Sequence, residues 1–399
     1  MNDRRDFLRI GIGSALGLGG LAGSVTQAAA EPQIRRYVRL GKTDLKISDI
    51  SFGSASSSDP GLVRHAVERG VNYFDSAESY RGGNAEQAIG DALQGKRDKV
   101  FLTSKTKAGA SDTRRDMMQA LEQSLKRLRT DYVDIYFNHA VNDVARMQNQ
   151  EWWEFTALAK KQGKIRFRGM SGHGGNLVEF LDYAIDKNLV DVILVAYNFG
   201  HDPKFVDKLR HTFHWAALQP ELPRVLAKAK QKDIGIVAMK VLMGAKLNDI
   251  RPYENGGATF AQAAFRWTLS TNYADALIVS MTDKVQIDEY LGASGEYKLR
   301  QGDVELLERY AQLQLGTYCQ SACNACETSC PDKVEIAEVL RTRMYAVGYR
   351  DPLLAKSEYA ALEKNAQACV ACAHQSCLNA CPNGVPIATF TRDAAMRLG

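Results

Sequence analysis

The stretch DKVFLTSKTKAGASDTRRDMMQALEQSLKRLRTDYVDIYFNH, residues 98–139, contains two short apolar runs separated by a long amphipathic segment. Residues 98–105 and 131–139 are rich in β-branched and aromatic residues, which is typical of buried strands. Residues 114–129 carry their apolar side chains at helical spacing. A strand, a helix and a second strand in this order predict two parallel strands with the helix covering one face of the sheet.

The same alternation of strand-like and helix-like segments continues from Arg36 to about Gly302. One further helix is expected at residues 176–188. Further strands are expected at residues 71–77, 164–172, 190–198, 234–240 and 275–281. About eight such units in roughly 265 residues suit a (β/α)8 TIM barrel of the α/β class. A doubly wound sheet is the alternative, but no G-x-G-x-x-G follows the first strand, which argues against a Rossmann dinucleotide site.

The charge of the chain argues against nucleic acid as a partner. The 399 residues contain 51 basic and 46 acidic side chains, so the net charge is only +5. No run of basic residues interleaved with aromatic ones occurs beyond the N-terminus.

The first thirty residues are expected to be an export signal rather than part of the fold. Arg4 and Arg5 precede an apolar, glycine-rich run over residues 10–25, and TQAAAEP at 26–32 supplies the small residues that a signal peptidase requires. This pattern resembles a cleaved twin-arginine signal over residues 1–30 and implies a periplasmic location. A membrane anchor is the alternative, but the run is shorter than the roughly 18 apolar residues of a spanning helix. We therefore expect no stable membrane span after cleavage.

All eight cysteines lie near the C-terminus, in two dense runs that each end in Cys-Pro. The first run reads C-x3-C-x2-C-x3-C-P and the second C-x2-C-x4-C-x3-C-P, which is similar to the ferredoxin run that binds a [4Fe-4S] cluster. Disulfides are the alternative in an exported protein, and a four-cysteine zinc site is a second one. The spacing favours iron-sulfur ligands, which are Cys319, Cys323, Cys326, Cys330, Cys369, Cys372, Cys377 and Cys381.

The ferredoxin resemblance also implies how the eight thiolates divide, because in two-cluster ferredoxins the fourth cysteine of each run ligates the other cluster. One cluster would be held by Cys319, Cys323, Cys326 and Cys381, and the other by Cys369, Cys372, Cys377 and Cys330. Both runs depart from the C-x2-C-x2-C spacing of ferredoxins. Helices are expected between the runs, at residues 334–349 and 357–366, so the tail over 301–399 is predicted to pack as a helical, ferredoxin-like cap.

Polar residues end four of the predicted strands, namely Asp75, Lys105, His139 and Ser171. In a parallel barrel these ends meet at one mouth, where barrel enzymes carry out their chemistry. At this point the sequence resembles the aldo-keto reductase family. NYFDSAESY is similar to the family segment in which an Asp is followed five residues later by a Tyr, here Tyr80. LTSKTK is similar to the strand that carries its Lys, and DYVDIYFNH to the strand that ends in its His. The resemblance extends from Arg36 to about Ser294, and we place the barrel at residues 36–300.

The resemblance implies a catalytic tetrad of Asp75, Tyr80, Lys105 and His139. Tyr80 would hand a proton to a carbonyl oxygen, and the Lys105 ammonium would lower the pKa of the Tyr80 phenol by stabilising its phenolate. Asp75 would hold Lys105 in place, and His139 would orient the carbonyl by a hydrogen bond. His173, which follows Ser171 at the same mouth, is a candidate for the substrate pocket.

The nicotinamide contacts of the family are only partly kept. Ser171 stands where the family holds the carboxamide of NADP(H), and Lys284 is placed to meet a 2′-phosphate. The usual neighbouring residues are replaced in this chain, by Gly172, Leu194, Met239 and Tyr290. A flavin in the barrel therefore stays open as an alternative to nicotinamide. Iron-sulfur clusters relay single electrons, so carbonyl chemistry also requires such a two-electron carrier.

The sequence as a whole predicts an exported oxidoreductase that interconverts a small carbonyl substrate and an alcohol. Two [4Fe-4S] clusters would relay electrons to or from a redox partner protein. The alternative is a catalytically idle barrel that serves as an electron-transfer or docking subunit of a periplasmic redox complex. A third reading, a barrel stapled by disulfides, predicts a protein without iron.

Overall fold

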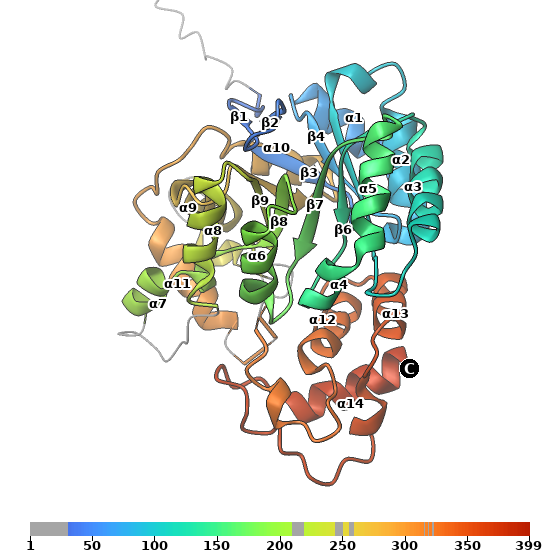
Figure 1. Cartoon of the computed structure of the whole chain (residues 1–399). Helices are drawn as coiled ribbons and strands as arrows, with labels where there is room; N and C mark the ends of the chain where they lie inside the picture. Colours follow the sequence, from blue (N-terminus) through green and yellow to red (C-terminus); the bar gives the residue numbers. More distant parts are fainter. Residues whose placement is uncertain are drawn as a thin grey trace, which may run out of the picture. The chain divides into compact units, whose positions relative to one another are not determined.

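The computed structural model describes residues 31–209, 219–243, 250–254, 259–314, 316–317, 319–320 and 323–399. The export signal expected over residues 1–30 lies outside them. Eight parallel strands close into a barrel in the order β10-β3-β4-β5-β6-β7-β8-β9, as Figure 1 shows. Their bounds are β3 Ile50–Gly53, β4 Tyr73–Asp75, β5 Phe101–Thr106, β6 Val133–Asn138, β7 Ile165–Gly172, β8 Val192–Ala196, β9 Gly235–Met239 and β10 Ala276–Ser280. The (β/α)8 barrel predicted from the strand and helix alternation is therefore confirmed.

Helices cover the outside of the barrel and bury their apolar faces against the strands (Figure 1). They are α1 Pro60–Glu68, α2 Asn84–Ala92, α3 Arg114–Leu128, α4 Val144–Gln148, α5 Gln150–Lys161, α6 Leu177–Asp186, α7 Pro203–Leu209, α8 Leu222–Gln231, α9 Phe260–Ser270 and α10 Lys284–Leu291. Side-chain caps start several of them, as where Thr113 accepts a hydrogen bond from the Asp116 amide. The amphipathic spacing predicted α3 and α6 correctly, because one apolar stripe faces the sheet.

The barrel has a separate interior core. Alternate strand residues point inward and form an apolar cluster with Leu40, Leu45 and Ile47. These three belong to an antiparallel hairpin of β1, Tyr37–Arg39, and β2, Lys46–Ser48, which precedes the barrel. Their burial caps the interior with apolar side chains, so the barrel is filled there and its chemistry is confined to the other end.

The strand predictions were incomplete at the start of the barrel. Seven of the eight barrel strands coincide with the apolar runs chosen from the sequence, whereas β3 and the hairpin were not among them. Each of these strands has only three or four residues, and β1 is largely exposed. Such short segments carry no recognisable run, because their burial depends on residues that arrive later in the chain.

The tail is helical. Helix α11, Asp303–Gln314, packs on the barrel through Leu306, Leu307 and Tyr310, whereas a distinct apolar cluster forms from residue 326 onward. That cluster joins α12 Ile336–Val347, α13 Pro352–Ala360 and α14 Ile387–Leu398. The helix expected at 357–366 begins earlier, because Asp351 accepts a hydrogen bond from the Leu354 amide and Pro352 starts the helix. In the described part of the chain, no helix has the length and apolar character of a membrane span.

One buried ion pair joins α9 to α11. Arg266 is fully buried and donates to both carboxylate oxygens of Asp303, at 2.8 and 2.6 Å. Removing one partner of such a pair leaves a buried charge without compensation. We expect Arg266→Ala to lower the free energy of unfolding by about 3–5 kcal/mol in denaturant titration. Arg300→Ala is the control, since its pair with Glu296 is half exposed, and should cost less than about 1 kcal/mol. Equal effects of the two substitutions would contradict this account.

Candidate functional site

The carboxyl ends of the barrel strands surround a cavity of about 380 Å³. The four predicted tetrad residues, Asp75, Tyr80, Lys105 and His139, all line it. Asp75 ends β4, Lys105 lies in β5, and His139 follows β6 directly. Tyr80 begins the short 3-10 helix η1, Tyr80–Gly83, in the loop after β4. The parallel strands thus bring together residues that are up to 64 positions apart in the chain, from Asp75 to His139.

An ion pair forms the floor of the site. The Lys105 ammonium donates to Asp75 Oδ1 at 2.6 Å and to the Ser76 carbonyl at 2.6 Å, and both charged side chains are almost completely buried. Thr103 donates to the second Asp75 oxygen at 2.8 Å. Burial lowers the pKa of Lys105, while the adjacent Asp75 carboxylate opposes this and favours the charged form.

The two aromatic members of the set lie against each other above this pair. The Tyr80 and His139 rings meet edge to face with centroids 5.5 Å apart. The Lys105 ammonium lies 4.8 Å from the centre of the Tyr80 ring. Burial lowers the pKa of His139 well below its usual value, and nearby cations, Lys105 first among them, add to this. His139 is therefore neutral near pH 7, so only one of its two ring nitrogens carries a proton that can be donated.

The expected lowering of the Tyr80 pKa is not found in this structure. Burial raises the pKa of the phenol well above its usual value, and the Asp75 carboxylate raises it further. The physical reason is that Lys105 already has a carboxylate partner at 2.6 Å, so little of its positive charge is left to stabilise a phenolate. Tyr80 is accordingly a protonated hydroxyl, which is the form that donates a proton.

Ser171 and His173 both line the cavity, as their positions at the end of β7 and directly after it predicted. The Ser171 hydroxyl oxygen accepts a hydrogen bond from the Ala140 amide at 3.0 Å, which fixes the side chain at the mouth. His173 is buried, and its Nδ1 has no hydrogen-bond partner among the described residues. Burial lowers the pKa of His173 well below its usual value, with Arg341 and Lys240 adding to the effect.

Lys284 is the one predicted contact that the structure does not bring to the cavity. It is an exposed residue at the start of α10, directly after the N-cap Asp283. Three later residues of the same helix line the cavity instead, namely Gln286, Glu289 and Tyr290. Residues 286, 289 and 290 share one helix face because they are three and four positions apart, and Lys284 lies on another face.

Sequence reasoning missed the roof of the cavity. Arg341 and Tyr345 from α12, Leu354 and Glu358 from α13, and Tyr349 between the two helices all line the same cavity as the tetrad. The i, i+4 spacing of each helical pair places both members on one helix face. The tail therefore closes the mouth of the barrel with polar side chains. The helical spacing of α12 was visible in the sequence, but nothing there indicated which surface its polar face would meet.

The roof is held by contacts between tail and barrel. Arg81 donates to Asp351 at 2.5 Å and Lys107 to Glu358 at 3.1 Å. The loop after β7 is tied to the first cysteine run, because Asn324 donates to Asn176 at 3.1 Å. That approach is close enough that a Cβ atom on Gly175 would collide with Asn324, so glycine is required there.

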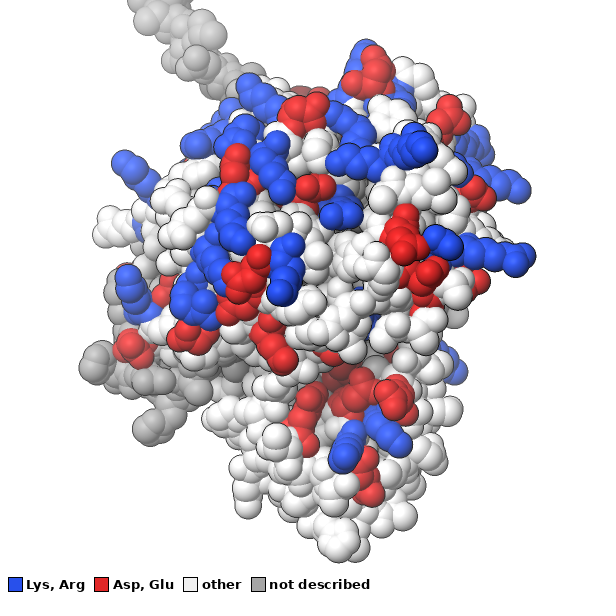
Figure 2. Space-filling model, viewed as in Figure 1, with Lys and Arg blue, Asp and Glu red and all other residues white. Residues whose placement is uncertain are grey.

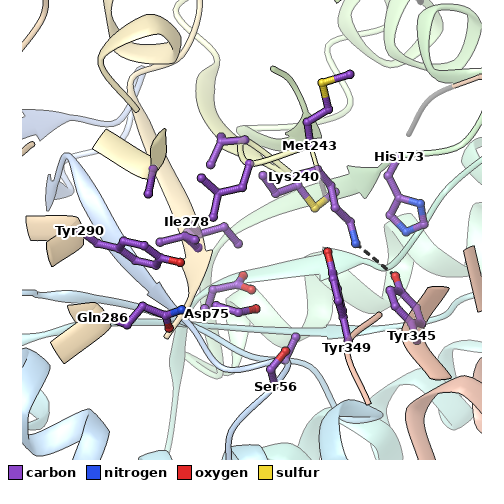
Figure 3. A pocket seen from close by; sticks show the side chains of 18 of the residues that line it. Ser56, Asp75, His173, Lys240, Met243, Ile278, Gln286, Tyr290, Tyr345 and Tyr349 are labelled. Atoms are coloured by element: carbon purple, nitrogen blue, oxygen red, sulfur yellow. Dashed lines mark hydrogen bonds between the residues drawn. The ribbon is translucent and has the colours of Figure 1, made fainter. Parts of the chain in front are cut away.

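Lys240, which follows β9, also points into the cavity (Figure 3). Its ammonium donates to the Tyr345 hydroxyl at 3.1 Å, and Arg341 donates to the same oxygen at 3.0 Å. Burial alone would raise the pKa of Tyr345, but the Arg341 and Lys240 cations outweigh burial and lower it to about 8. Tyr345 is thus the tyrosine of this site that ionises near neutral pH, whereas Tyr80 stays protonated.

The eight cysteines form two groups of four, and none of the eight takes part in a disulfide. In the first group burial raises the pKa of Cys319, Cys323 and Cys326, and the neighbouring Cys381 thiol raises each of them further. In the second group burial raises the pKa of Cys369 and Cys377, the neighbouring Cys330 and Cys372 thiols raise both further, and all four cysteines line one small pocket. Cys381 thus lies near thiols of the first run and Cys330 near thiols of the second, while the division of the eight cysteines between two clusters stays a prediction.

These groups do not have the geometry of a single-ion site. Among the described residues, no three or more His, Cys, Asp or Glu side chains converge so as to hold one metal ion. A tetrahedral zinc site requires four thiolates about 2.3 Å from one point. Iron-sulfur clusters and zinc both stay predictions for these cysteines.

Comparisons with known proteins match the barrel part of the chain. The sequence profile described as "Aldo/keto reductase family" matches residues 51–253. The chain is 28% identical over 183 residues to the uncharacterized oxidoreductase YqkF of Bacillus subtilis (strain 168), covering 42% of this chain and 58% of YqkF. It is 32% identical over 231 residues to the methylglyoxal reductase YeaE of Escherichia coli (strain K12), covering 54% of this chain and 72% of YeaE.

The fold comparison points the same way. The aldo/keto reductase from Klebsiella pneumoniae, solved in complex with NADP and acetate, superposes with a TM-score of 0.53 at 24% identity, covering 69% of this chain and 95% of that one. The chain belongs to the aldo/keto reductase family and is an oxidoreductase of that type.

The low pKa of Tyr345 generates a prediction. An ultraviolet titration of phenolate absorbance should show a tyrosine that ionises near pH 8, and this step should vanish in Tyr345→Phe. Because the folded pKa of about 8 lies below the ordinary value of about 10, ionised Tyr345 adds stability that is complete above about pH 10 and is lost as the pH falls through about 8. Tyr132→Phe, on the opposite side of the barrel from the cavity, should keep the early step; its loss there would contradict the assignment.

Proposed function

We propose that this protein is an exported oxidoreductase that interconverts a small carbonyl compound and an alcohol at Tyr80, Lys105, Asp75 and His139. The observation that carries the proposal is the buried Lys105–Asp75 pair, at 2.6 Å, beneath the Tyr80 and His139 rings at one cavity. A buried pair of opposite charges with a phenol and a neutral imidazole above it is a constellation with defined acid and hydrogen-bonding roles.

Reduction of a carbonyl group to an alcohol needs two electrons and two protons, delivered as a hydride to carbon and a proton to oxygen. Tyr80 donates the proton from its hydroxyl, because its raised pKa keeps it protonated before the oxygen becomes basic. Neutral His139 donates a hydrogen bond to the same oxygen and orients it. Lys105, held by Asp75, lies 4.8 Å from the centre of the Tyr80 ring and so stands beside the phenolate that Tyr80 becomes after the transfer, although Asp75 offsets much of its charge.

The cavity fits a nicotinamide dinucleotide in extent. It runs from the tetrad past Met239 and Ser280 to Gln286 and Tyr290 on α10. NADP(H), when bound, supplies or accepts the hydride, and relatives such as the Klebsiella pneumoniae enzyme were solved with NADP. In this chain Ser171 would meet the carboxamide and Met239 would lie against the ring. Lys284 lies outside the cavity, so a 2′-phosphate would have to find other donors.

We further propose that the two cysteine groups bind two [4Fe-4S] clusters. Burial and the neighbouring thiols raise the pKa of Cys319 and Cys326 and so disfavour their thiolate forms, and a cationic metal cluster would relieve this, because coordinated thiols are deprotonated. The pocket beside Cys330, Cys369, Cys372 and Cys377 gives room for a group bound by all four. The clusters would relay single electrons. We also propose that the boundary between the barrel domain and the cluster domain lies near residue 300.

A redox partner protein would approach the tail. Val370 and Leu378, each directly after a cysteine of the second run, are 50% and 52% exposed. On the face seen in Figure 2, charged side chains are dense over the barrel and sparse over the lower part of the tail. Transient electron-transfer contacts are small, and apolar contacts close to the metal centre suit them.

Export by the twin-arginine route, with removal of residues 1–30 and release into the periplasm, completes the proposal. Arg4 and Arg5 before the apolar run support it. The test is fractionation of cells that produce the full chain. The protein should be found in the periplasm, and Arg4→Lys combined with Arg5→Lys should leave it in the cytoplasm.

The Tyr80 assignment predicts the loss of one function only. With NADPH or an artificial electron donor and small aldehydes such as methylglyoxal, Tyr80→Phe should lower kcat by roughly 10²–10⁴-fold, because the proton donor is missing. Iron content should not change, and Tyr132→Phe should behave as the unsubstituted protein. Full turnover by Tyr80→Phe would overturn the tetrad. Absence of turnover in the unsubstituted protein would favour the alternative of an electron-transfer or docking subunit, which the replaced residues Leu194 and Met239 support.

The cluster assignment predicts iron in two equal parts. Protein purified without oxygen should contain about eight iron atoms per chain, and Cys326→Ser or Cys377→Ser should each lower this to about four. Cys381→Ser should affect the same cluster as Cys326→Ser, although the two residues belong to different runs. The electron paramagnetic resonance signal that each variant retains identifies the cluster. Colourless protein with zinc or with disulfides would rule the clusters out.

A further inference from the structure

Three polar groups that line the cavity, two from the barrel and one from the tail, lack the partners that buried groups normally have. In the described part of the chain, the Lys240 ammonium has no carboxylate partner, and its hydrogen bond goes to the Tyr345 hydroxyl. Arg341 Nε and His173 Nδ1 are buried without any hydrogen-bond partner there. Buried polar atoms without partners cost free energy, so a place where several occur together indicates a ligand that satisfies them.

The backbone holds Lys240 in a costly conformation. Its φ is 58°, in the left-handed region that non-glycine residues seldom adopt. Asn198 fixes this turn by donating to the Lys240 carbonyl at 3.0 Å. The result is that the side chain points across the cavity toward Tyr345, with His173 beside it, as Figure 3 shows. A strained residue that is held in place at a cavity wall is a sign of a functional position.

The charges around these groups favour an anion. Arg341 already contacts Glu338, and its NH1 lies 3.8 Å from Glu358, so the outer side of its guanidinium is neutralised. Lys107 pairs with the same Glu358 at 3.1 Å. Lys240 makes no ion pair or hydrogen bond with a carboxylate among the described residues, and Glu358, on which its charge acts, is already paired with Lys107. Lys240, the Arg341 Nε–H and the hydroxyl of Tyr345 are all donors, and together they suit the planar oxygens of a carboxylate.

These donors lie at the reacting end of the cavity. Arg341 is among the charges that act on Tyr80, on His139 and on His173. Both Arg341 and Tyr345 come from the tail, which roofs the tetrad, whereas α10 lines the far part of the cavity. An anionic group bound here would belong to a small molecule whose carbonyl group reaches Tyr80. The phosphates of a dinucleotide share this chemistry, but they would need donors toward α10.

We propose that Lys240, Arg341, Tyr345 and His173 form an anion subsite that binds the carboxylate of the substrate, so that the substrates are oxo acids and the corresponding hydroxy acids. This inference rests on the proposed function in one respect only, namely that the reacting group of the substrate is a carbonyl. The tail then has a second role, because it supplies half of the groups that select the substrate.

The test is a binding measurement that requires no turnover. Calorimetric titration of the mature holoprotein with benzoate and with the neutral isostere benzamide should give at least tenfold tighter binding of benzoate. Lys240→Gln and Arg341→Gln should each weaken benzoate binding tenfold or more and leave benzamide binding unchanged. Arg343→Gln is the matched control, since Arg343 lies on the same helix but faces Asp393 at 2.6 Å, and it should bind benzoate as the unsubstituted protein does.

The outcomes separate this inference from the proposed function. Tyr80→Phe should bind benzoate normally while losing turnover, and intact benzoate binding in a protein that reduces no carbonyl would overturn the proposed function alone. Equal affinity for benzoate and benzamide in the unsubstituted protein would overturn the subsite, whether or not the variants fold. Pyrophosphate binding that is lost in Lys240→Gln, with benzoate binding unchanged in both variants, would assign Lys240 to a nucleotide and also overturn it. Thermal unfolding of each variant shows whether it is folded.

In a protein that does reduce carbonyls, kinetics give a second readout. The kcat/KM for 4-carboxybenzaldehyde should be at least ten times that for benzaldehyde. Arg341→Gln should reduce this ratio to near unity by raising the KM for 4-carboxybenzaldehyde. A fall of kcat for both aldehydes equally would show that Arg341 supports the structure rather than binding the carboxylate.

Discussion

The buried pair between Lys105 and Asp75 is the interaction on which the site depends. A lysine and an aspartate with almost no exposure are tolerated inside a barrel only because each compensates the other, and Thr103 and the Ser76 carbonyl complete their hydrogen bonds. The pair bridges the neighbouring strands β4 and β5, so it is fixed by the barrel itself. Burial, reinforced by the Asp75 carboxylate, leaves Tyr80 protonated. A site built in this way favours proton donation to a substrate over phenolate chemistry in the resting protein.

The roof of the cavity is positioned by the tail and not by the barrel strands. Helix α12 has one face in the apolar core of the tail, where Val339, Leu340 and Met344 are buried, and another face on the cavity, where Arg341 and Tyr345 lie. On that second face Arg341 contacts Glu338 within the tail, and the Tyr345 hydroxyl accepts a hydrogen bond from the barrel residue Lys240. Because the helix joins the core of the tail to the wall of the cavity, a change in the tail that moves α12 would also move that wall. The tail is thus part of the site as well as the place of the cysteines.

The sequence predicted those parts of the molecule that depend on local pattern. Seven strands, the long helix α3 and the order of Asp75, Tyr80, Lys105 and His139 were recognisable because each rests on neighbouring residues or on a fixed spacing. The start of α13 was misplaced at residue 357, because the Asp351 cap makes Pro352 the first residue of the helix. The pKa of Tyr80 was expected to fall, because burial and the competing partner of Lys105 cannot be judged without the packing.

By itself the sequence determined the barrel, through alternating apolar and amphipathic segments whose periods are fixed by backbone geometry. It also determined which polar residues end the strands, and that eight thiols gather in two runs of the tail. Only the tertiary structure decided what covers the mouth. Lys240 and Tyr345 are 105 positions apart, and their hydrogen bond exists because the tail folds back over the strand ends. No local pattern encodes that contact, since it arises from two separately packed cores meeting at one cavity.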